Sequence, residues 1–345
     1  MIASTLPASW YVDPGIAAAE RRDVFGREWL CIGRDDALRR PGDYVATDVC
    51  GWQVLVVVDG DGRLRGHHNV CRHRAGPLVA AGCGSARSLV CRYHGWAYGL
   101  DGALRSARDF GAADGELDLD ALSLHPVRVE RWRSLLFVNV DLHGDAPPLL
   151  DALGTFADAC QGFPMESLQT VAELEHPLAC NWKTYADNYH EGYHVPLVHP
   201  GLNKEIDARR YEVTVDEAHR WVRHDAPARD GAVNEGRWLW RWPNLALNLY
   251  PSAMNVERYE PLDPGRCRLR YTYAAAPGIG EDELAAVLRV SGEITAEDVA
   301  ICEAVQRGLA SGAYDVGVLS PRHEGAVAAF HRWVRFAVDP ASARL

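Results

Sequence analysis

Two short motifs in the first third of the chain limit what this sequence can fold into. The first is a C-x-H motif at Cys71 and His73, and the second is a C-x-x-H motif at Cys91 and His94, with seventeen residues between them. Together the motifs offer two thiolates and two imidazoles, which are ligands for transition metals. The sequence therefore predicts two metal-binding loops close together in the fold.

The distribution of these four side chains favours iron and sulfur over zinc. A Rieske [2Fe-2S] cluster needs two cysteines on one iron and two histidines on the other, and here each loop can give one ligand to each iron. A structural zinc site is the alternative, but zinc motifs usually pair like residues. Gly76 and Gly95 suit tight turns around a cluster, and residues 100–102 are typical of a hairpin. We therefore predict a protein that transfers electrons.

Length, charge and cysteine content exclude several classes of protein. A chain of 345 residues has room for a second domain, so a one-domain electron carrier is disfavoured. The formal net charge of -11 argues against nucleic-acid binding. Nine cysteines, an odd number, and no signal peptide indicate a reducing compartment. Without a long apolar run, we expect a soluble, cytoplasmic protein with no membrane contact.

Secondary-structure signals change along the chain. Asp13 and Pro14 are typical of a helix start. From about Gly42 to Val140 the sequence is rich in short β-forming runs, and residues 143–148 are typical of a linker. Helical and strand patterns alternate beyond it. The clearest predicted strands are residues 52–58, 89–91, 135–140 and an edge-like strand at 268–275, and residues 295–309 have helical spacing.

A second group of possible ligands lies near the middle of the chain. Asp187, Glu191 and His194 stand at i, i+4 and i+7, so they share one face if a helix runs through this segment. Pro196 is then expected to end or kink the helix and to bring His199 beside His194. Two histidines with one carboxylate are the ligand set of non-haem Fe(II) oxygenases.

From near its start to its end, the chain resembles the large (alpha) subunit of Rieske non-haem iron oxygenases. The cluster loops lack the extra cysteines of cytochrome bc-type proteins, and the central segment matches D-x-x-x-E-x-x-H-x-x-x-x-H. The resemblance implies an α+β protein: an all-β Rieske [2Fe-2S] domain plus an α+β catalytic domain, with an antiparallel sheet flanked by helices (helix-grip or START-like). It implies an N-terminal helix at 1–37 that packs on the catalytic domain, the Rieske domain at 38–141 and the catalytic mononuclear iron domain at 142–345.

The resemblance also implies the iron ligands. His194 and His199 match the histidine pair of the family, and Asp298 occupies the position of its aspartate ligand, with Glu297 and Glu303 as the first alternatives. Alternatively, Asp298 and its neighbour are first-turn acids that interact with the helix dipole after an N-cap at Thr295. The cluster ligands implied are Cys71, His73, Cys91 and His94.

Two further acids have implied roles. In the resembled family, the residue at Glu191 bridges a cluster histidine of one subunit to an iron histidine of the next in a head-to-tail homotrimer. Most members carry Asp there, and a solvated helix acid is the alternative for Glu191. Asp187 is a candidate for orienting an iron histidine. His190 is out of register with the pattern, so we expect it at the surface or just outside the ligands.

The implied function is that of a terminal oxygenase component. Such a component uses O₂ and electrons from NAD(P)H to hydroxylate, N-dealkylate or cleave a small organic substrate. No G-x-G-x-x-G motif is present, so a separate reductase, with or without a ferredoxin, must supply the electrons. Residues 182–199 and 306–309 look most like choline, glycine betaine and carnitine monooxygenases, which implies a quaternary ammonium substrate. An aromatic-ring hydroxylating oxygenase is the alternative, and the iron histidines disfavour a non-catalytic Rieske electron-transfer protein.

Two groups of residues are candidates for binding a substrate or a partner protein. Residues 237–250 are aromatic and then alternating, so a strand can present Asn248 and Tyr250 on one side. Aromatic faces attract quaternary ammonium groups, although each single tryptophan here also suits a core. The arginines near the cluster motifs either form a basic docking site for an acidic redox partner or pack and pair locally. They are Arg63, Arg65, Arg72, Arg74 and Arg92.

Overall fold

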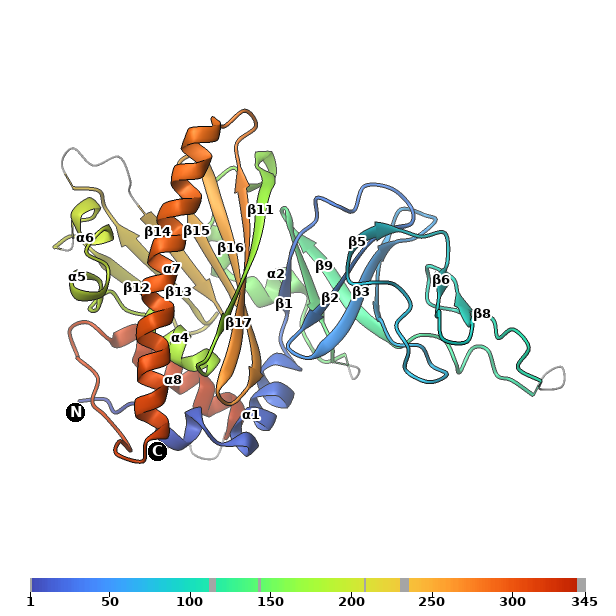
Figure 1. Ribbon diagram of the computed structural model, residues 1–345, viewed down its shortest axis with the longest axis horizontal. Coiled ribbons are helices and arrows are strands. Elements are labelled where there is room, and N and C mark those ends of the chain that lie inside the picture. Colours follow the sequence, from blue (N-terminus) through green and yellow to red (C-terminus); the bar gives the residue numbers. More distant parts are fainter. Residues whose placement is uncertain (1, 112–115, 142–143, 208, 230–235, 340–345) are drawn as a thin grey trace. The chain divides into compact units, whose positions relative to one another are not determined.

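The structure is a computed structural model that describes residues 2–111, 116–141, 144–207, 209–229 and 236–339 (Figure 1). The chain forms two compact units. Gly26–Leu149 form the smaller unit, and Met1–Phe25 together with Leu150–Leu345 form the larger one. The functional limits expected from the sequence remain predictions, and the expected linker at 143–148 lies partly outside the described residues.

The smaller unit is built from antiparallel strands (Figure 1). Its described residues form a seven-stranded sheet in the order β1-β10-β9-β4-β3-β2-β5 and a three-stranded sheet in the order β6-β7-β8. The expected all-β character is confirmed. The strands are β1 (Leu30–Arg34), β2 (Asp43–Val49), β3 (Trp52–Val58), β4 (Leu64–His68), β5 (Gly82–Ser85), β6 (Leu89–Val90), β7 (Ala97–Tyr98), β8 (Leu104–Ser106), β9 (Pro126–Trp132) and β10 (Leu135–Asn139).

Apolar runs and one glycine turn explain these strands. The run predicted at residues 52–58 is β3, and the run at 135–140 is β10, whose residues are all buried. A short, continuously apolar run is typical of a strand covered on both faces. The hairpin expected at residues 100–102 joins β7 and β8, and Gly102 adopts a φ of +86° there, a conformation that favours glycine.

The larger unit places helices against an antiparallel sheet (Figure 1). Within the described residues, this sheet has seven strands in the order β11-β17-β16-β15-β14-β13-β12. The α+β class is confirmed. The strands are β11 (Gln169–Leu178), β12 (Glu212–Asp216), β13 (Trp221–Ala226), β14 (Gly236–Arg241), β15 (Leu245–Leu249), β16 (Ala253–Asp263) and β17 (Arg266–Ala275).

The first α-helix begins at the predicted start signal. Helices further along the chain differ in length from the predictions. Asp13 caps the first α-helix by accepting a hydrogen bond from Gly15 N at 2.6 Å. The α-helices are α1 (Pro14–Glu20), α2 (Leu149–Leu153), α3 (Thr155–Ala159), α4 (Trp182–Tyr189), α5 (Val195–Val198), α6 (Leu202–Glu205), α7 (Glu281–Ala310) and α8 (Gly325–Val338). Shorter helical turns are η1 (Ala8–Tyr11), η2 (Arg21–Phe25) and η3 (Met165–Ser167).

The strand β17 corrects one prediction. We expected residues 268–275 to form an edge-like strand, but β17 lies between β11 and β16. Arg268 and Arg270 lie 2.7 and 3.0 Å from Glu260 on β16, and both lie 3.4 Å from Glu175 on β11. Opposite charges on neighbouring strands stabilise a sheet. The alternating arginines therefore belong to an ion-pair ladder across interior strands.

A buried ion pair fastens the N-terminal segment to helix α4. Lys183 Nζ lies 2.6 Å from Glu20 Oε1, and Trp182 Nε1 donates to Glu20 Oε2 at 2.9 Å. Both charged groups are almost completely buried. Removing one partner of such a pair costs about 3 to 5 kcal/mol, because the other charge is left buried alone. The contact holds α4 in place, and α4 leads directly into the histidine segment.

Over the described ranges, no helix has both the length and the apolar character needed to cross a membrane.

Candidate metal centres

Helix α4 carries the first part of the candidate iron site and is shorter than predicted. Asn181 caps it by accepting a hydrogen bond from Lys183 N at 3.0 Å. The helix ends at Tyr189, so Glu191 and His194 lie beyond it. The prediction that they share a helical face with the preceding aspartate is therefore wrong, because the helix stops too early.

Pro196 begins a helix instead of ending one. It lies in the first turn of α5, where a missing backbone N–H costs no hydrogen bond. His194 immediately precedes this helix and His199 immediately follows it. One helical turn thus separates the two histidines, and their Nε2 atoms lie 3.2 Å apart. The predicted convergence of the rings is observed, through a different local structure.

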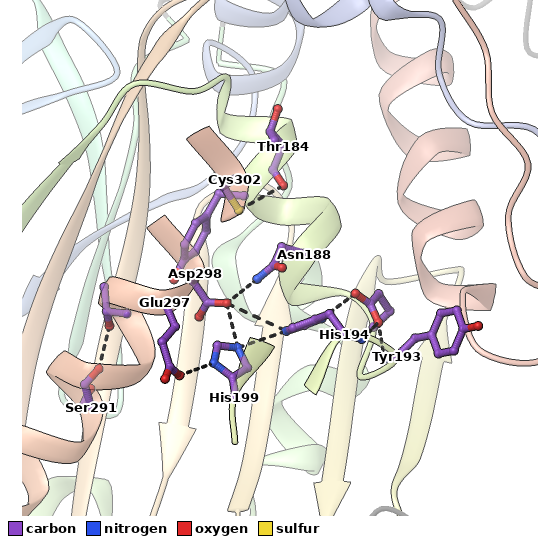
Figure 2. A network of polar contacts seen from close by, with 12 residues as sticks. Thr184, Asn188, Tyr193, His194, His199, Ser291, Glu297, Asp298 and Cys302 are labelled. Atoms are coloured by element: carbon purple, nitrogen blue, oxygen red, sulfur yellow. Dashed lines mark hydrogen bonds and ion pairs between the residues drawn. The ribbon is translucent and has the colours of Figure 1, made fainter. Parts of the chain in front are cut away.

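Asp298 reaches the histidine pair from helix α7, 99 positions after His199 (Figure 2). Its Oδ1 lies 2.9 Å from His199 Nε2 and 3.9 Å from His194 Nε2. Asn188 Nδ2 donates to the same oxygen at 2.7 Å. One ligand atom from each of the three residues lies within 4.8 Å of the others, a spacing that suits a single metal ion.

The length of α7 removes one alternative for Asp298. The helix begins at Glu281, so Thr295 lies in its interior and donates its hydroxyl to Ser291 O at 2.8 Å. Thr295 is therefore not an N-cap, and Asp298 is not in a first turn. Its backbone position gives no stabilisation from the N-terminal end of the helix dipole. Asp298 is also only 8% exposed, unlike a solvated acid.

Two other carboxylates determine which way the imidazoles face. Glu191 Oε1 lies 2.5 Å from His194 Nδ1. Glu297 Oε2 lies 2.8 Å from His199 Nδ1 (Figure 2). Because an ionised carboxylate only accepts, each Nδ1 carries the hydrogen and each Nε2 keeps its lone pair. These lone pairs and Asp298 Oδ1 converge on one point, which requires a positive charge there.

This donor set fits a mononuclear metal ion. Burial lowers the pKa of His199, but its contacts with Asp298 and Glu297 outweigh that effect and raise the pKa overall. A proton on the ring can supply the missing charge when no metal is bound. Two imidazoles and one carboxylate are the ligand set that holds Fe(II) and leaves positions for O₂. His194, His199 and Asp298 are thus the residues that could hold iron.

The surroundings of Glu191 argue against a solvated helix acid. Its Oε2 accepts hydrogen bonds from the backbone of Tyr193 and, at 3.1 Å, from His194 N. The side chain is 11% exposed and lies outside any helix. Its carboxylate has further lone pairs, so these contacts leave room for another donor.

Two neighbouring residues lie elsewhere than predicted. Asp187 was expected to orient an iron histidine, but it accepts hydrogen bonds from Tyr11 Oη at 2.6 Å and from His331 Nε2 at 2.9 Å. His190 is not at the surface: it is completely buried and stacks on Phe330 with 4.7 Å between ring centroids. Burial lowers the pKa of His190 to about 4, so the ring is neutral. Both residues instead contact helix α8, through His331 and Phe330.

The two cluster loops share one backbone pattern. In each loop the cysteine N–H donates to the carbonyl five positions later, at 2.8 Å for Cys71 and 2.9 Å for Cys91. The residue four positions later donates back to the cysteine carbonyl, at 3.0 Å from Ala75 and 2.9 Å from Gly95. Both of these residues have positive φ, +57° and +75°. The first loop therefore places an alanine where the second has a glycine.

Gly76 is required by the space around the cysteines. A Cβ at this position would lie 2.9 Å from Cys91 Sγ and 3.3 Å from Tyr93 Cβ. The residue does not have the positive φ that its neighbour adopts. We expected glycine at this position because of a tight turn. The structure instead requires it because the two loops approach each other closely here.

The side chains of the loops fit a cluster with two kinds of ligand. Cys71 and Cys91 are 3% and 2% exposed, and the rings of His73 and His94 face each other with 4.6 Å between centroids. Within the described part of the chain, the buried Nδ1 of His73 has no hydrogen-bond partner. Tyr98 Oη lies within hydrogen-bond distance of Cys71 Sγ, at 3.3 Å. Two thiols and two imidazoles on adjacent loops suit a Rieske [2Fe-2S] cluster.

The arginines near the cluster divide between the two interpretations. Arg65 pairs with Asp59 at 2.7 Å, and Arg72 contacts His125. Arg74 lies over the ring of Tyr93, 5.0 Å from its centroid, and stays exposed. Local pairing thus accounts for Arg65 and Arg72. The exposed arginine and tyrosine beside His94 keep the docking interpretation open.

Sequence reasoning missed the role of Glu297, which we considered only as an alternative ligand or a first-turn acid. Two adjacent acids inside a helix point about 100° apart, so Glu297 and Asp298 can contact the two nitrogens of one ring. They do so at His199. This i, i+1 pair was a usable signal. No sequence pattern pointed to Asn188, which donates a hydrogen bond to Asp298.

The aromatic segment forms two strands, β14 and β15, where we expected one. Asn248 faces helix α4 and accepts a hydrogen bond from Tyr189 Oη at 2.8 Å. Trp240 and Trp242 are completely buried, which favours the core interpretation for both. Tyr250 follows the end of β15. One side of the sheet thus combines aromatic and amide groups beside the candidate iron site.

Comparisons with known proteins agree with both centres. Residues 28–117 match the family described as Rieske [2Fe-2S] domain, and residues 165–339 match the ring hydroxylating alpha subunit (catalytic domain). Choline monooxygenase of Spinacia oleracea is 31% identical over 344 residues, covering 96% of this chain and 78% of the relative. The carnitine monooxygenase oxygenase subunit of Escherichia coli K12 is 30% identical over 325 residues, covering 90% and 85%.

Solved structures share the fold of the whole chain. The quaternary ammonium Rieske monooxygenase CntA, with a bound inhibitor, has a TM-score of 0.89 and 28% identity, covering 97% of this chain and 96% of that one. Naphthalene 1,2-dioxygenase has a TM-score of 0.79 at 21% identity, covering 96% and 91%, a likeness of fold. This chain therefore belongs to the Rieske non-haem iron oxygenases, as an oxygenase subunit with a [2Fe-2S] cluster and a mononuclear iron.

Proposed function

We propose that this protein oxidises a small quaternary ammonium compound, with electrons that reach it from NAD(P)H through a separate reductase. The observation that carries this proposal is the buried, tyrosine-rich side of the sheet beside His194, His199 and Asp298. The similarity to choline and carnitine monooxygenases along most of the chain supports the same substrate class.

The aromatic rings suit a cation that cannot donate hydrogen bonds. Tyr185 and Tyr189 on α4 lie over Tyr259 of β16, with 5.5 and 6.3 Å between ring centroids. His224 joins this group, 5.7 Å from Tyr189, and burial lowers its pKa to about 3, so it is uncharged. Faces of aromatic rings attract ammonium groups through cation–π interaction.

The protein side chains have separate tasks in this scheme. When bound, the cluster supplies single electrons and the mononuclear iron activates O₂. Glu191 and Glu297 hold the two imidazoles with Nε2 facing the metal, and Asn188 holds Asp298. For a hydroxylation, one substrate C–H, O₂, two electrons and two protons give one C–OH and one water.

We further propose a homotrimer in which Glu191 bridges His194 to a cluster histidine of a neighbouring subunit, so that electrons pass from that cluster to the iron across this contact. Glu191 and His194 line a cavity of about 510 Å³ in the larger unit, with apolar walls that include Ile301 and Val305. Exposed apolar side chains surround this region, among them Val318 at 74%. Apolar surface of this kind marks contacts between proteins.

The aromatic-ring alternative is less well supported by the same residues. A hydrocarbon ring carries no positive charge, so it gains no cation–π attraction from the faces of the tyrosine rings near the candidate iron. Aromatic hydrocarbons are therefore included as competing substrates in the test.

Single-turnover oxidation tests the proposal without the native reductase. The purified protein is reduced with dithionite, freed of excess reductant and mixed with O₂ and one candidate: choline, L-carnitine, glycine betaine or naphthalene. We expect rapid cluster oxidation and an oxidised product with at least one ammonium compound. Product from naphthalene alone, or from none of the four, contradicts the proposed substrate class. Analytical ultracentrifugation tests the trimer.

A further inference from the structure

One face of the large sheet carries a single charged side chain beside the candidate iron site. Pairing in β13 to β17 places Glu257 opposite Ala246 and Tyr271, and Asn255 opposite Asn248. Cross-strand partners share a face, and alternate residues along each strand follow them. On this face of the five described strands, up to the irregularity after Pro261 in β16, Glu257 is the only Asp, Glu, Lys or Arg.

The opposite face of the same strands is entirely different. It carries the ion-pair ladder in which Glu260 contacts Arg268 and Arg270. Glu257 and Glu260 are both 2% exposed, but only Glu260 has cationic partners among the described residues. A buried charge without a partner is costly, so a carboxylate retained in such a place needs an explanation.

The contacts of Glu257 connect it to the candidate iron site. Asn248 Nδ2 donates to Glu257 Oε2 at 3.3 Å, and Tyr189 Oη donates to Asn248 Oδ1 at 2.8 Å. Tyr189 is adjacent in α4 to Asn188, which donates to Asp298. A continuous chain of contacts thus runs from Glu257 to the third proposed iron ligand.

Several polar atoms on this face of the sheet have no hydrogen-bond partner within the described residues. They are both amide atoms of Asn255, the hydroxyl of Tyr259, Trp240 Nε1 and His224 Nε2, and all four side chains are almost completely buried. Buried polar groups are normally paired, so a cluster of unpaired ones on one face indicates a place that a ligand or water completes.

The protonation of Glu257 agrees with a missing cation. Burial raises the pKa of Glu257 to about 8, hydrogen bonding from Asn248 opposes the increase, and the nearby charge of Asp298 adds to it. Tyr185 and Tyr271 also lie close enough to lower this pKa by hydrogen bonding. At neutral pH the carboxyl group is therefore mostly protonated until a positive charge arrives.

We propose that Glu257 is the counter-charge that recognises the ammonium group of the substrate. This inference rests on the proposed function, and it identifies the residue that makes the site prefer a positively charged substrate. A quaternary ammonium group has no N–H and offers nothing to a neutral hydrogen-bond acceptor, so aromatic rings and one buried negative charge are the groups that can recognise it. The same carboxylate repels a substrate carboxylate at this end of the site. The substrate therefore approaches Glu257 with its cationic end.

The test compares choline with 3,3-dimethylbutan-1-ol, which has the same shape and no charge. Binding to the iron-loaded, oxidised protein is measured by calorimetry for the wild type and for Glu257→Gln. We expect the substitution to weaken choline binding by roughly thirtyfold or more, as for a buried charge pair that loses one partner. Binding of the neutral alcohol should stay within about twofold.

Glu260→Gln is the matched control, because it removes an equally buried carboxylate from the other face of β16. It should leave the ratio of the two affinities unchanged. Equal loss of choline and alcohol binding in Glu257→Gln, or an unchanged affinity for choline, overturns the inference. A wild-type protein that binds none of the ammonium compounds overturns the proposed function itself.

Glu257→Asp keeps the test usable where the glutamine variant does not retain its cluster spectrum. It preserves the negative charge but moves the carboxylate back by the length of one methylene group. We expect choline to lose more affinity than the alcohol, because only choline interacts with the charge. Equal losses for the two ligands assign Glu257 a structural role and refute its role as counter-charge.

Discussion

The two metal centres of this protein are assembled in opposite ways. The proposed cluster ligands lie in one stretch from Cys71 to His94, and backbone hydrogen bonds four and five residues long shape both loops. The proposed iron ligands come from both ends of a short helix and from a second helix 99 positions away. The cluster loops are thus local structures, whereas the iron site exists only when distant helices pack together.

This difference determines what holds each ligand in place. In the cluster loops the backbone positions the cysteines, and a close contact at Gly76 sets the distance between the loops. At the iron site, side chains do this work: Glu191 and Glu297 hold the imidazoles, and Asn188 holds the aspartate. We therefore expect substitutions outside the ligands to affect the iron site more than the cluster.

The largest expected effect is the complete loss of one metal centre while the other stays intact. Asp298→Ala should abolish product formation and remove mononuclear iron, because a pair of imidazoles alone binds Fe(II) weakly. The visible spectrum of the cluster should stay unchanged. Glu303→Gln is the control on the same helix, where the carboxylate accepts a hydrogen bond from Ala179 N at 2.9 Å. Iron analysis and spectra that show both centres lost together in Asp298→Ala contradict this independence.

A second substitution examines the cluster in the same way. His94→Cys should keep an iron–sulfur chromophore in part of the protein and lower its reduction potential by roughly 200 mV or more, because a thiolate donates more charge than an imidazole. A spectroscopic redox titration measures the change, with His125→Asn as the control outside the motifs. An unchanged potential in His94→Cys removes His94 from the ligand set.

The two carboxylates that hold the histidines should differ in what they control. Glu297→Gln should weaken Fe(II) binding by about ten- to a hundredfold, since it faces only His199. Glu191→Gln should retain both metals and the oligomer but lose most electron transfer from the reduced cluster to iron. Single-turnover cluster oxidation at saturating Fe(II) compares them. A wild-type rate in Glu191→Gln makes it an ordinary orienting residue.

The smallest effects compare the two cluster loops with each other. Gly95→Ala adds a Cβ at a φ of +75°, with no atom within 4 Å of it, so only backbone strain remains, about 1 kcal/mol. Ala75→Gly removes similar strain but makes the unfolded chain more flexible, so the two effects nearly cancel. Thermal unfolding of both variants measures the difference. A larger loss of stability in Ala75→Gly than in Gly95→Ala contradicts a shared backbone conformation of the two loops.

The sequence by itself determined the features that depend on neighbours in the chain. The two cluster motifs, the β7–β8 hairpin and the N-cap at Asp13 follow from residue type and short spacing, because the hydrogen bonds involved span few residues. The strand at 52–58 could also be predicted, since its apolar run is continuous. The class of the cluster followed from the ligand types and their distribution between the two loops, and that of the iron site followed from its two histidines together with the resemblance to the oxygenases.

Only the tertiary structure decided which distant groups meet. Packing against α8 placed Asp187 with His331 and buried His190 against Phe330, and the full length of α7 excluded Thr295 as an N-cap. The arginines of β17 resembled an edge because Glu175, their partner on β11, lies 93 positions before Arg268. Burial and charge pairing depend on packing between such segments, and no local pattern encodes which side chain will supply the opposite charge.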